Sequence, residues 1–228
     1  MFWFYDYYYL ILVVPAILLS VYAQIKVHST YKKYAEVFAK NSVTATEVTR
    51  KILDKNGLFS VQIEAVGGQL TDHFDPRTNV IRLSDSVRGD VSVAAIGVAA
   101  HEAGHAVQYK TGYTPIKLRN AVLPAANLGS RLSIPLILLG FLLSAEFLVT
   151  FGILLFSLVL LFQVVTLPVE FNASRRAITT LDREGILSGE ELIGVKKVLR
   201  AAALTYVAAA LTTAMQLLRL ILLSRRRD

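Results

Sequence analysis

The chain has no cysteine among its 228 residues, and it contains only four histidines. Without cysteine it cannot form a disulfide, and no thiolate can bind a metal. Any bound metal must therefore be held by histidine and carboxylate. Charge is also scarce, because only 18% of the residues are charged and 54% are hydrophobic, with a mean hydropathy of +0.50. This composition is unlike that of a soluble globular protein and indicates a membrane protein.

The charge that is present is unbalanced, with a formal net value of +7. Basic proteins often bind nucleic acid, but this chain carries no nucleic-acid-binding motif. Its Lys and Arg residues instead cluster beside hydrophobic stretches, where anionic lipid headgroups are a sufficient reason for them. We therefore expect a lipid bilayer, and no nucleic acid, as a partner of the protein.

Four apolar stretches predict membrane helices, at about residues 7–25, 132–145, 147–167 and 201–223. The first and third are long enough to span a hydrocarbon core of about 30 Å. The second is short, but if it extends back to Leu123 it forms a helical hairpin with the third, turning at Ser144-Ala145-Glu146. The fourth contains several polar residues, so it either crosses the membrane or packs on the protein and the membrane surface.

The amino terminus predicts an uncleaved membrane anchor. It opens Met1-Phe2-Trp3-Phe4-Tyr5-Asp6, without the positive charge with which a signal peptide begins. Aromatic residues at this end are expected to form an interfacial belt, namely Trp3, Tyr5 and Tyr7 to Tyr9. Basic residues follow the span, namely Lys26, Lys32, Lys33 and Lys40.

The distribution of basic residues predicts the orientation of the chain in a cell membrane. By the positive-inside rule, the amino terminus is outside and the segment after the first span is cytoplasmic. The basic stretch after Leu167 then also falls inside. Three arginines at 225–227 conflict with a full fourth crossing, so the path of the last helix is left open.

The sequence His101-Glu102-Ala103-Gly104-His105 carries the chemistry of the chain. On a helix, side chains at i and i+4 share one face, so the two imidazoles can bind one Zn²⁺ while Glu102 reaches a water on that metal. The surrounding pattern predicts a helix over 91–108, with Asp90 or Ser92 as its cap and Gly112 as its stop. Two buried histidines of an Ala-rich core helix would be the structural alternative.

The region before this helix predicts a small α+β fold. Thr44 and Glu47 fit a capping box that opens a helix ending at Gly57. Two strands are expected, over 59–66 and 79–83, with a turn at 75–78 before the second. An exposed strand edge near the metal could hold an extended peptide by backbone hydrogen bonds, or the sheet could only support the helix.

A catalytic zinc normally has three protein ligands, so the motif needs one more. His28, His73 and Glu170 are the candidates. Glu170 is favoured because it follows the third apolar stretch and falls on the same predicted cytoplasmic side, where Pro168 can begin a new helix. The alternative is a solvated Glu170 paired with a neighbouring arginine such as Arg175 or Arg176.

Three segments together resemble the YugP-like family of neutral zinc metallopeptidases of bacterial membranes: residues 71–77, 98–108 and 170–174. The resemblance covers nearly the whole chain. It implies zinc peptidase activity with His101 and His105 as ligands, Glu102 as general base and Glu170 as third ligand. More distantly the plan resembles membrane metallopeptidases of the HtpX and CAAX-protease type. Their pattern has Asp where this chain has Ser174, so the group that orients a ligating histidine must differ, with Asp72 or Asn172 as candidates.

The expected fold is a mainly α membrane protein with three to four transmembrane helices and a small α+β, zincin-like region that contains the HExxH helix. Four parts are predicted, namely an anchor over 1–27, a cytoplasmic metallopeptidase region over 28–120, a transmembrane hairpin over 121–167 and a helical region over 168–228. The expected activity is that of a multi-pass membrane zinc endopeptidase, with one Zn²⁺ per chain, that cuts a polypeptide substrate.

Two other functions are open at this stage. A site-2-type intramembrane protease also uses His-Glu-x-Gly-His, but its second motif is matched here only by Leu181-Asp182-Arg183. A membrane scaffold could keep a structural metal site, which four protein ligands would close. The group that would stabilise the oxyanion is also undecided among His73, Arg200 and Tyr206.

Overall fold

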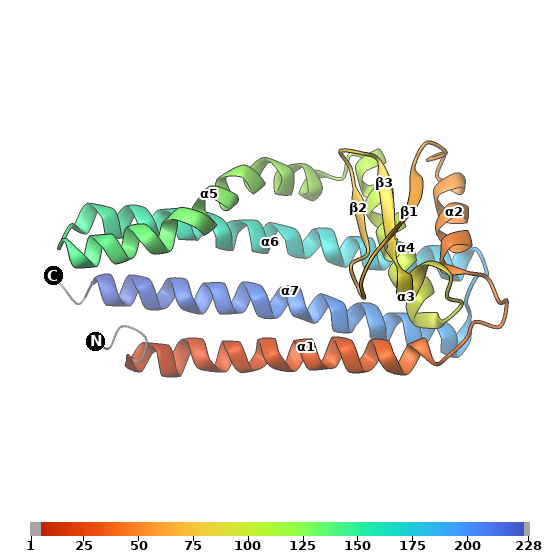
Figure 1. Ribbon diagram of the computed structural model, residues 1–228, viewed down its shortest axis with the longest axis horizontal. Coiled ribbons are helices and arrows are strands. Elements are labelled where there is room, and N and C mark those ends of the chain that lie inside the picture. Colours follow the sequence, from red (N-terminus) through yellow and green to blue (C-terminus); the bar gives the residue numbers. More distant parts are fainter. Residues whose placement is uncertain (1–5, 226–228) are drawn as a thin grey trace. The chain divides into compact units, whose positions relative to one another are not determined.

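Four helices are long and apolar enough to cross a membrane in the computed structural model, which describes residues 6–225 (Figure 1). They are Tyr9–Ala35, which consists of a π-helical segment Tyr9–Val13 followed by α1 (Val14–Ala35), and then α5 (Thr114–Leu142), α6 (Glu146–Arg183) and α7 (Gly189–Ser224). The chain is therefore mainly helical, as its composition predicts. Trp3, Tyr5, Arg226 and Arg227, on which part of the predicted topology rests, lie outside the described residues.

The chain divides into two compact units. The first, called the helical unit, consists of the chain up to residue 24, residues 117–168 and the chain from 204 onward. The second, called the sheet-containing unit, consists of residues 25–116 and 169–203. Each unit is described by itself below.

In the helical unit, α5 and α6 form the predicted hairpin. α5 ends at Leu142 and α6 begins at Glu146, so the turn falls where the sequence places it. Ser144 occupies the left-handed region, with φ of 52°. Glycine lets the two backbones approach, because a Cβ on Gly152 would lie 2.9 Å from the carbonyl oxygen of Ser133. Small residues at such crossings are typical of helices that pack within membranes.

The first and last helices of this unit run antiparallel and share polar contacts (Figure 1). The Asp6 carboxylate accepts two hydrogen bonds from Arg219, at 2.9 Å from Nε and 2.6 Å from Nη2. Arg219 is 1% exposed, and its guanidinium lies over the Tyr9 ring. Further along, the hydroxyls of Ser20 and Thr212 lie 3.0 Å apart. The buried charge on α7 is therefore paired.

The sheet-containing unit begins with α2 (Ala45–Lys55), for which the predicted capping box is present. Thr44 Oγ1 accepts a hydrogen bond from the Glu47 amide, and the Glu47 carboxylate accepts one from the Thr44 amide. The remaining elements are β1 (Gln62–Val66), β2 (His73–Asp75), β3 (Val80–Ser84), α3 (Asp85–Arg88) and α4 (Val93–Lys110). The sheet order is β1-β3-β2, with β1 parallel and β2 antiparallel to β3.

Three predictions about local structure need correction. β1 begins at Gln62 rather than Phe59, which lies 74% exposed in the preceding turn. Residues 73–75 form an edge strand, whereas the sequence predicted only the turn at 75–78. Three residues are too few to show an alternating pattern of apolar and polar side chains. Pro168 lies inside α6 and does not begin a helix. A proline removes one helical hydrogen bond, and long apolar helices tolerate that loss.

The core of the sheet-containing unit fixes α4 in place. Buried apolar side chains from α2, α4, the sheet and the described parts of α6 and α7 in this unit form one cluster. Ser92 begins α4 as its cap, and Gly112 follows its end with φ of 61°. Gly104 lies against α6 so closely that a Cβ there would be 2.8 Å from the carbonyl oxygen of Ala173. This contact brings the middle of α4 next to the segment that contains Glu170.

Candidate metal centre

Three side chains that the sequence selects as metal ligands converge in the sheet-containing unit. His101 and His105 lie one turn apart on α4, and Glu170 lies on α6. One ligand atom from each lies within 4.8 Å of the others. Glu170 contacts the two histidines, and no arginine pairs with it among the described residues. This arrangement favours the ligand interpretation of Glu170 over that of a solvated carboxylate.

The distances between these atoms fit a tetrahedral zinc ion. Ligand atoms at about 2.0–2.2 Å from such an ion lie about 3.3–3.6 Å from one another. His101 Nε2 and His105 Nε2 are 3.1 Å apart, and Glu170 Oε2 is 3.3 Å from the first and 3.6 Å from the second. The three atoms therefore form nearly the triangular face that a zinc ion would cap. A fourth position is left for water or substrate.

Gln108 fixes the proton of His105. The Gln108 amide nitrogen donates to the Val169 carbonyl oxygen at 2.8 Å and to Asn172 Oδ1 at 3.0 Å. Because a carbonyl can only accept, the other end of this amide must be Oε1, which faces His105 Nδ1 at 3.0 Å. His105 therefore donates its Nδ1 proton there, and its Nε2 keeps a free lone pair for a metal.

Ser174 has the corresponding position beside His101. Its Oγ lies 3.1 Å from His101 Nδ1, and a hydroxyl can accept the proton on that nitrogen. Neither residue predicted to replace the Asp of the HtpX and CAAX-protease pattern contacts a ligating histidine directly. Asn172 acts one step away, through Gln108, whereas Asp72 binds the amide and hydroxyl of Ser84 and touches neither histidine. A serine one turn beyond Glu170 on α6 supplies the orienting group instead.

Glu102 is 8% exposed and is held by the edge strand. Its Oε2 accepts a hydrogen bond from the Phe74 amide of β2 at 3.0 Å. Burial raises the pKa of the Glu102 carboxyl above its ordinary value, and the nearby Glu170 charge acts in the same direction, whereas the two histidines oppose it. A carboxyl with a raised pKa is a better proton acceptor when it is ionised.

The two buried carboxylates of this site favour the binding of a cation. Glu102 and Glu170 are both buried, and neither has a Lys or Arg partner among the residues that the structure describes. Buried carboxylates without a cationic partner are costly and rare. A divalent metal ion between the histidines and Glu170 would compensate both charges. The donor set, with two imidazoles and one carboxylate, is typical of catalytic zinc.

Comparisons with known proteins identify the family to which the chain belongs. A family model described as "Putative neutral zinc metallopeptidase" matches residues 9–225. The chain belongs to this family. It is also 46% identical over 215 residues to the "Putative membrane protease YugP" of Bacillus subtilis (strain 168), covering 94% of this chain and 96% of that protein. No solved structure matches the chain. The resemblance to the YugP-like family is thereby confirmed, and zinc is the metal that the family description names.

Other residues considered from the sequence lie outside the three-residue cluster. His28 is exposed on α1, and His73 is exposed on β2, where its Nδ1 faces the Thr71 carbonyl oxygen at 2.8 Å. Asp182 is exposed near the end of α6. Neither histidine joins the ligand group, and the position of Asp182 does not favour the intramembrane alternative. Gln108 was not expected to contact a ligand, although its place three residues after His105 puts it on the same helix face.

Proposed function

We propose that the protein is a membrane-bound zinc endopeptidase whose zincin-like catalytic region is the sheet-containing unit. The observation that supports this most is the triangle of His101 Nε2, His105 Nε2 and Glu170 Oε2, with sides of 3.1–3.6 Å. Three ligands leave one coordination position open, as catalytic zinc requires and structural zinc does not. The family description and the name of the relative support the same reaction.

The residues of the chain divide the work as follows. His101, His105 and Glu170 would hold one zinc ion, which when bound polarises a carbonyl and acidifies a water. Ser174 and Gln108 accept from Nδ1 of the two imidazoles, which leaves Nε2 of each free to bind the zinc ion. Glu102 accepts the proton of the attacking water and delivers it to the leaving amine. The Phe74 amide keeps the Glu102 carboxylate in one orientation.

The edge strand β2 supports a peptide as substrate. β2 pairs only with β3 among the described residues, so its other edge is not used within the sheet. That edge faces the catalytic helix, because the Phe74 amide reaches Glu102 on α4. An extended peptide can hydrogen-bond to such an edge and pass close to the metal. We therefore propose polypeptides, on or beside the membrane, as the substrate class.

The test of this function is Glu102→Gln. Glutamine keeps the shape and can still accept the Phe74 hydrogen bond, but it cannot take a proton. We expect hydrolysis of an unfolded membrane protein to fall by about 10²–10⁴-fold. Zinc content, measured on the same purified sample by mass spectrometry of the metal, should be unchanged.

The matched control is Glu36→Gln, because Glu36 is an exposed carboxylate in the turn after α1 and pairs with no described residue. This variant should cleave and bind zinc like the parent. Full activity of Glu102→Gln would exclude the proposed mechanism. A zinc ion with four protein ligands and no water, seen by X-ray absorption spectroscopy, would instead indicate a structural site.

A further inference from the structure

A second polar site of the sheet-containing unit is basic and is separate from the metal centre. A pocket of about 240 Å³ lies between α2, α4 and α6. No Asp or Glu lines it. Asn56 lines it beside α2, and its cationic and hydroxyl side chains all belong to α6, namely Arg175, Arg176, Thr179, Thr180 and Arg183. Their guanidinium and hydroxyl groups can all donate hydrogen bonds.

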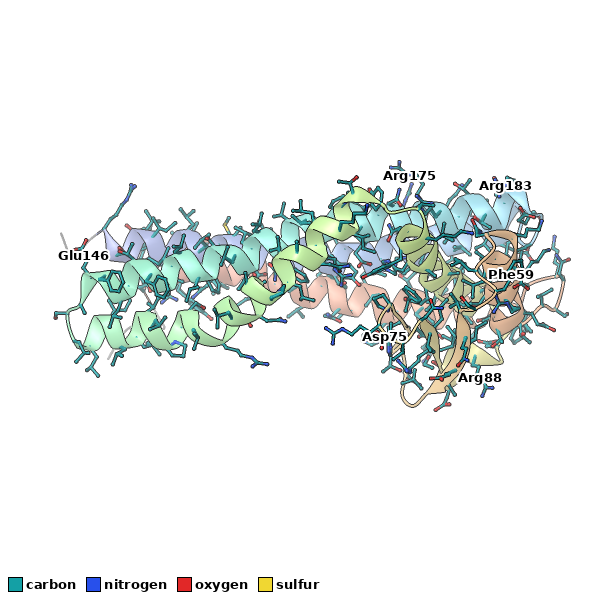
Figure 2. The ribbon with its side chains drawn as sticks, turned by 90° about the horizontal axis from the view of Figure 1, so that it is seen from above. Phe59, Asp75, Arg88, Glu146, Arg175 and Arg183 are labelled. Atoms are coloured by element: carbon teal, nitrogen blue, oxygen red, sulfur yellow. The ribbon has the colours of Figure 1, made fainter. Side chains whose placement is uncertain are left out.

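The three arginines keep much of their hydrogen-bonding capacity. Arg175 makes no ion pair or hydrogen bond with another described residue. Arg176 donates from Nε to Asn172 Oδ1 at 2.8 Å and lies over the Tyr113 ring, and its two terminal nitrogens make no hydrogen bond to a described residue. Arg183 Nε lies 3.4 Å from Glu184 Oε1, but that carboxylate is also bound by Lys55. Figure 2 shows Arg175 and Arg183 projecting from the same side of α6.

These groups match a tetrahedral oxyanion. Guanidinium groups bind phosphate through paired N–H donors, and threonine hydroxyls add further donors. Three cations around one cavity repel one another, so an anion between them is favoured. We propose that this pocket binds a phosphate group, carried either by the headgroup of an anionic lipid or by a free phosphate.

The position of the arginines in the sequence makes a lipid headgroup a reasonable source. The apolar run of α6 ends near Pro168, and Arg175 follows seven residues later, which is about 10 Å along a helix. Basic residues at this distance from an apolar span are suited to the headgroup layer. The same chemistry would accept a free phosphate, so the experiment must separate the two.

The pocket is linked to the metal centre by hydrogen bonds. Asn172 Oδ1 accepts from Arg176 and from Gln108, and Gln108 Oε1 accepts from His105. A phosphate bound to Arg176 would therefore restrain the group that orients a zinc ligand. Binding itself does not depend on zinc or on proteolysis, so its test is independent of the proposed function.

The first measurement is calorimetric titration of the full chain with inorganic phosphate in a maltoside detergent, which contains no phosphate. Arg175→Gln combined with Arg183→Gln should weaken binding by at least about tenfold, because two charged donors to the phosphate are lost. The control is Arg88→Gln, an exposed arginine of α3 that does not line the pocket (Figure 2). It should bind phosphate like the parent.

The second measurement separates the sources. Native mass spectrometry compares retention of phosphatidylglycerol with that of diacylglycerol, which lacks phosphate. Selective retention of phosphatidylglycerol by the parent, lost in the pocket variant, supports a lipid headgroup. Calorimetric binding of phosphate without lipid retention supports a free phosphate.

If the parent binds neither, or if Arg88→Gln loses as much as the pocket variant, the proposal is wrong. Arg175→Gln alone, at an exposed and unpaired side chain, serves if the double variant does not fold.

Discussion

At the scale of the residue, the metal centre depends on where each imidazole carries its proton. Nε2 can bind zinc only when the proton is on Nδ1, and an acceptor beside Nδ1 keeps it there. Gln108 is such an acceptor for His105, and its own orientation is fixed by the Val169 carbonyl. His101 has only the hydroxyl of Ser174 in this position. His105 is thus oriented by an amide that is itself fixed, whereas His101 is oriented by a single hydroxyl.

Replacement of Ser174 tests the weaker of these contacts. Ser174→Ala leaves the Nδ1 proton of His101 without an acceptor, so we expect zinc affinity to fall by about 10–100-fold. Ser174→Asp should retain or increase the affinity, because a carboxylate accepts this proton more strongly. Competition with a chromophoric chelator measures both. Ser60→Ala, in an exposed turn, is the control, and an unchanged affinity in Ser174→Ala would show that the contact does not orient His101.

The sequence predicts the ligands better than their supports. His101, Glu102 and His105 are set by local spacing on one helix, so their grouping could be predicted without a fold. Glu170 could be predicted only as a candidate, because its approach depends on how α6 packs on α4. Ser174 meets His101 only in the folded chain, and the orientation of the Gln108 amide depends on Val169 and Asn172 of α6. The sequence alone therefore could not show that Ser174 orients His101.

At the scale of the element, the site depends on how closely α4 and α6 pack. Gly104→Ala tests this contact, because the added Cβ would lie 2.8 Å from the Ala173 carbonyl oxygen and 3.3 Å from its Cα. Alanine is favoured over glycine within a helix by about 1 kcal/mol, but this clash is with backbone and cannot relax easily. We expect a net loss of about 1–3 kcal/mol in the free energy of unfolding, measured by thermal denaturation, together with weaker zinc binding.

Gly89→Ala is the control for this prediction. Gly89 ends α3 with φ of −98°, and a Cβ there would meet nothing within 4 Å. This variant should be as stable as the parent and should bind zinc normally. A Gly104→Ala protein that is more stable than the parent would show that α4 and α6 can separate without loss. Such a result would contradict the close packing that brings Glu170 to the histidines.

The contact between the first and last helices includes one ion pair with a buried arginine, between Asp6 and Arg219. Asp6→Ala leaves Arg219 buried without its carboxylate, so we expect a loss of about 3–5 kcal/mol in the free energy of unfolding. Arg219→Met added to Asp6→Ala should recover much of this, because the uncompensated charge is removed. Asp182→Ala, at an exposed carboxylate, is the control. A double variant no more stable than Asp6→Ala would mean that the pair contributes by direct attraction.

Short elements explain where the predicted fold differs. α2, α4 and the long apolar helices have caps or periodic patterns, so their existence could be predicted. β2 has three residues, and its identity depends on pairing with β3 rather than on its own sequence. It is nevertheless the strand that holds Glu102. The strand that contacts the proposed general base was therefore the element with the least sequence signal.

At the scale of the whole molecule, the open question is whether α7 crosses the membrane. Arg225 to Arg227 argue against a crossing by the positive-inside rule. The structure favours a fourth crossing. Asp6 precedes α1 and pairs with Arg219 near the end of α7, so the start of the first helix and the end of the last one lie together within the helical unit. We therefore predict four crossings, with the amino terminus, the α5–α6 turn and the end of α7 all outside the cell.

The absence of cysteine makes this topology directly measurable, because each introduced cysteine is the only one. In intact cells, a maleimide that cannot cross membranes should label Ser144→Cys and Arg225→Cys. It should label Ser60→Cys, in the sheet-containing unit, only after permeabilisation. If Arg225→Cys behaves like Ser60→Cys, α7 does not cross. If all three results are reversed, the four crossings hold but the catalytic unit lies outside, and its substrates must then be sought on the outer face of the membrane.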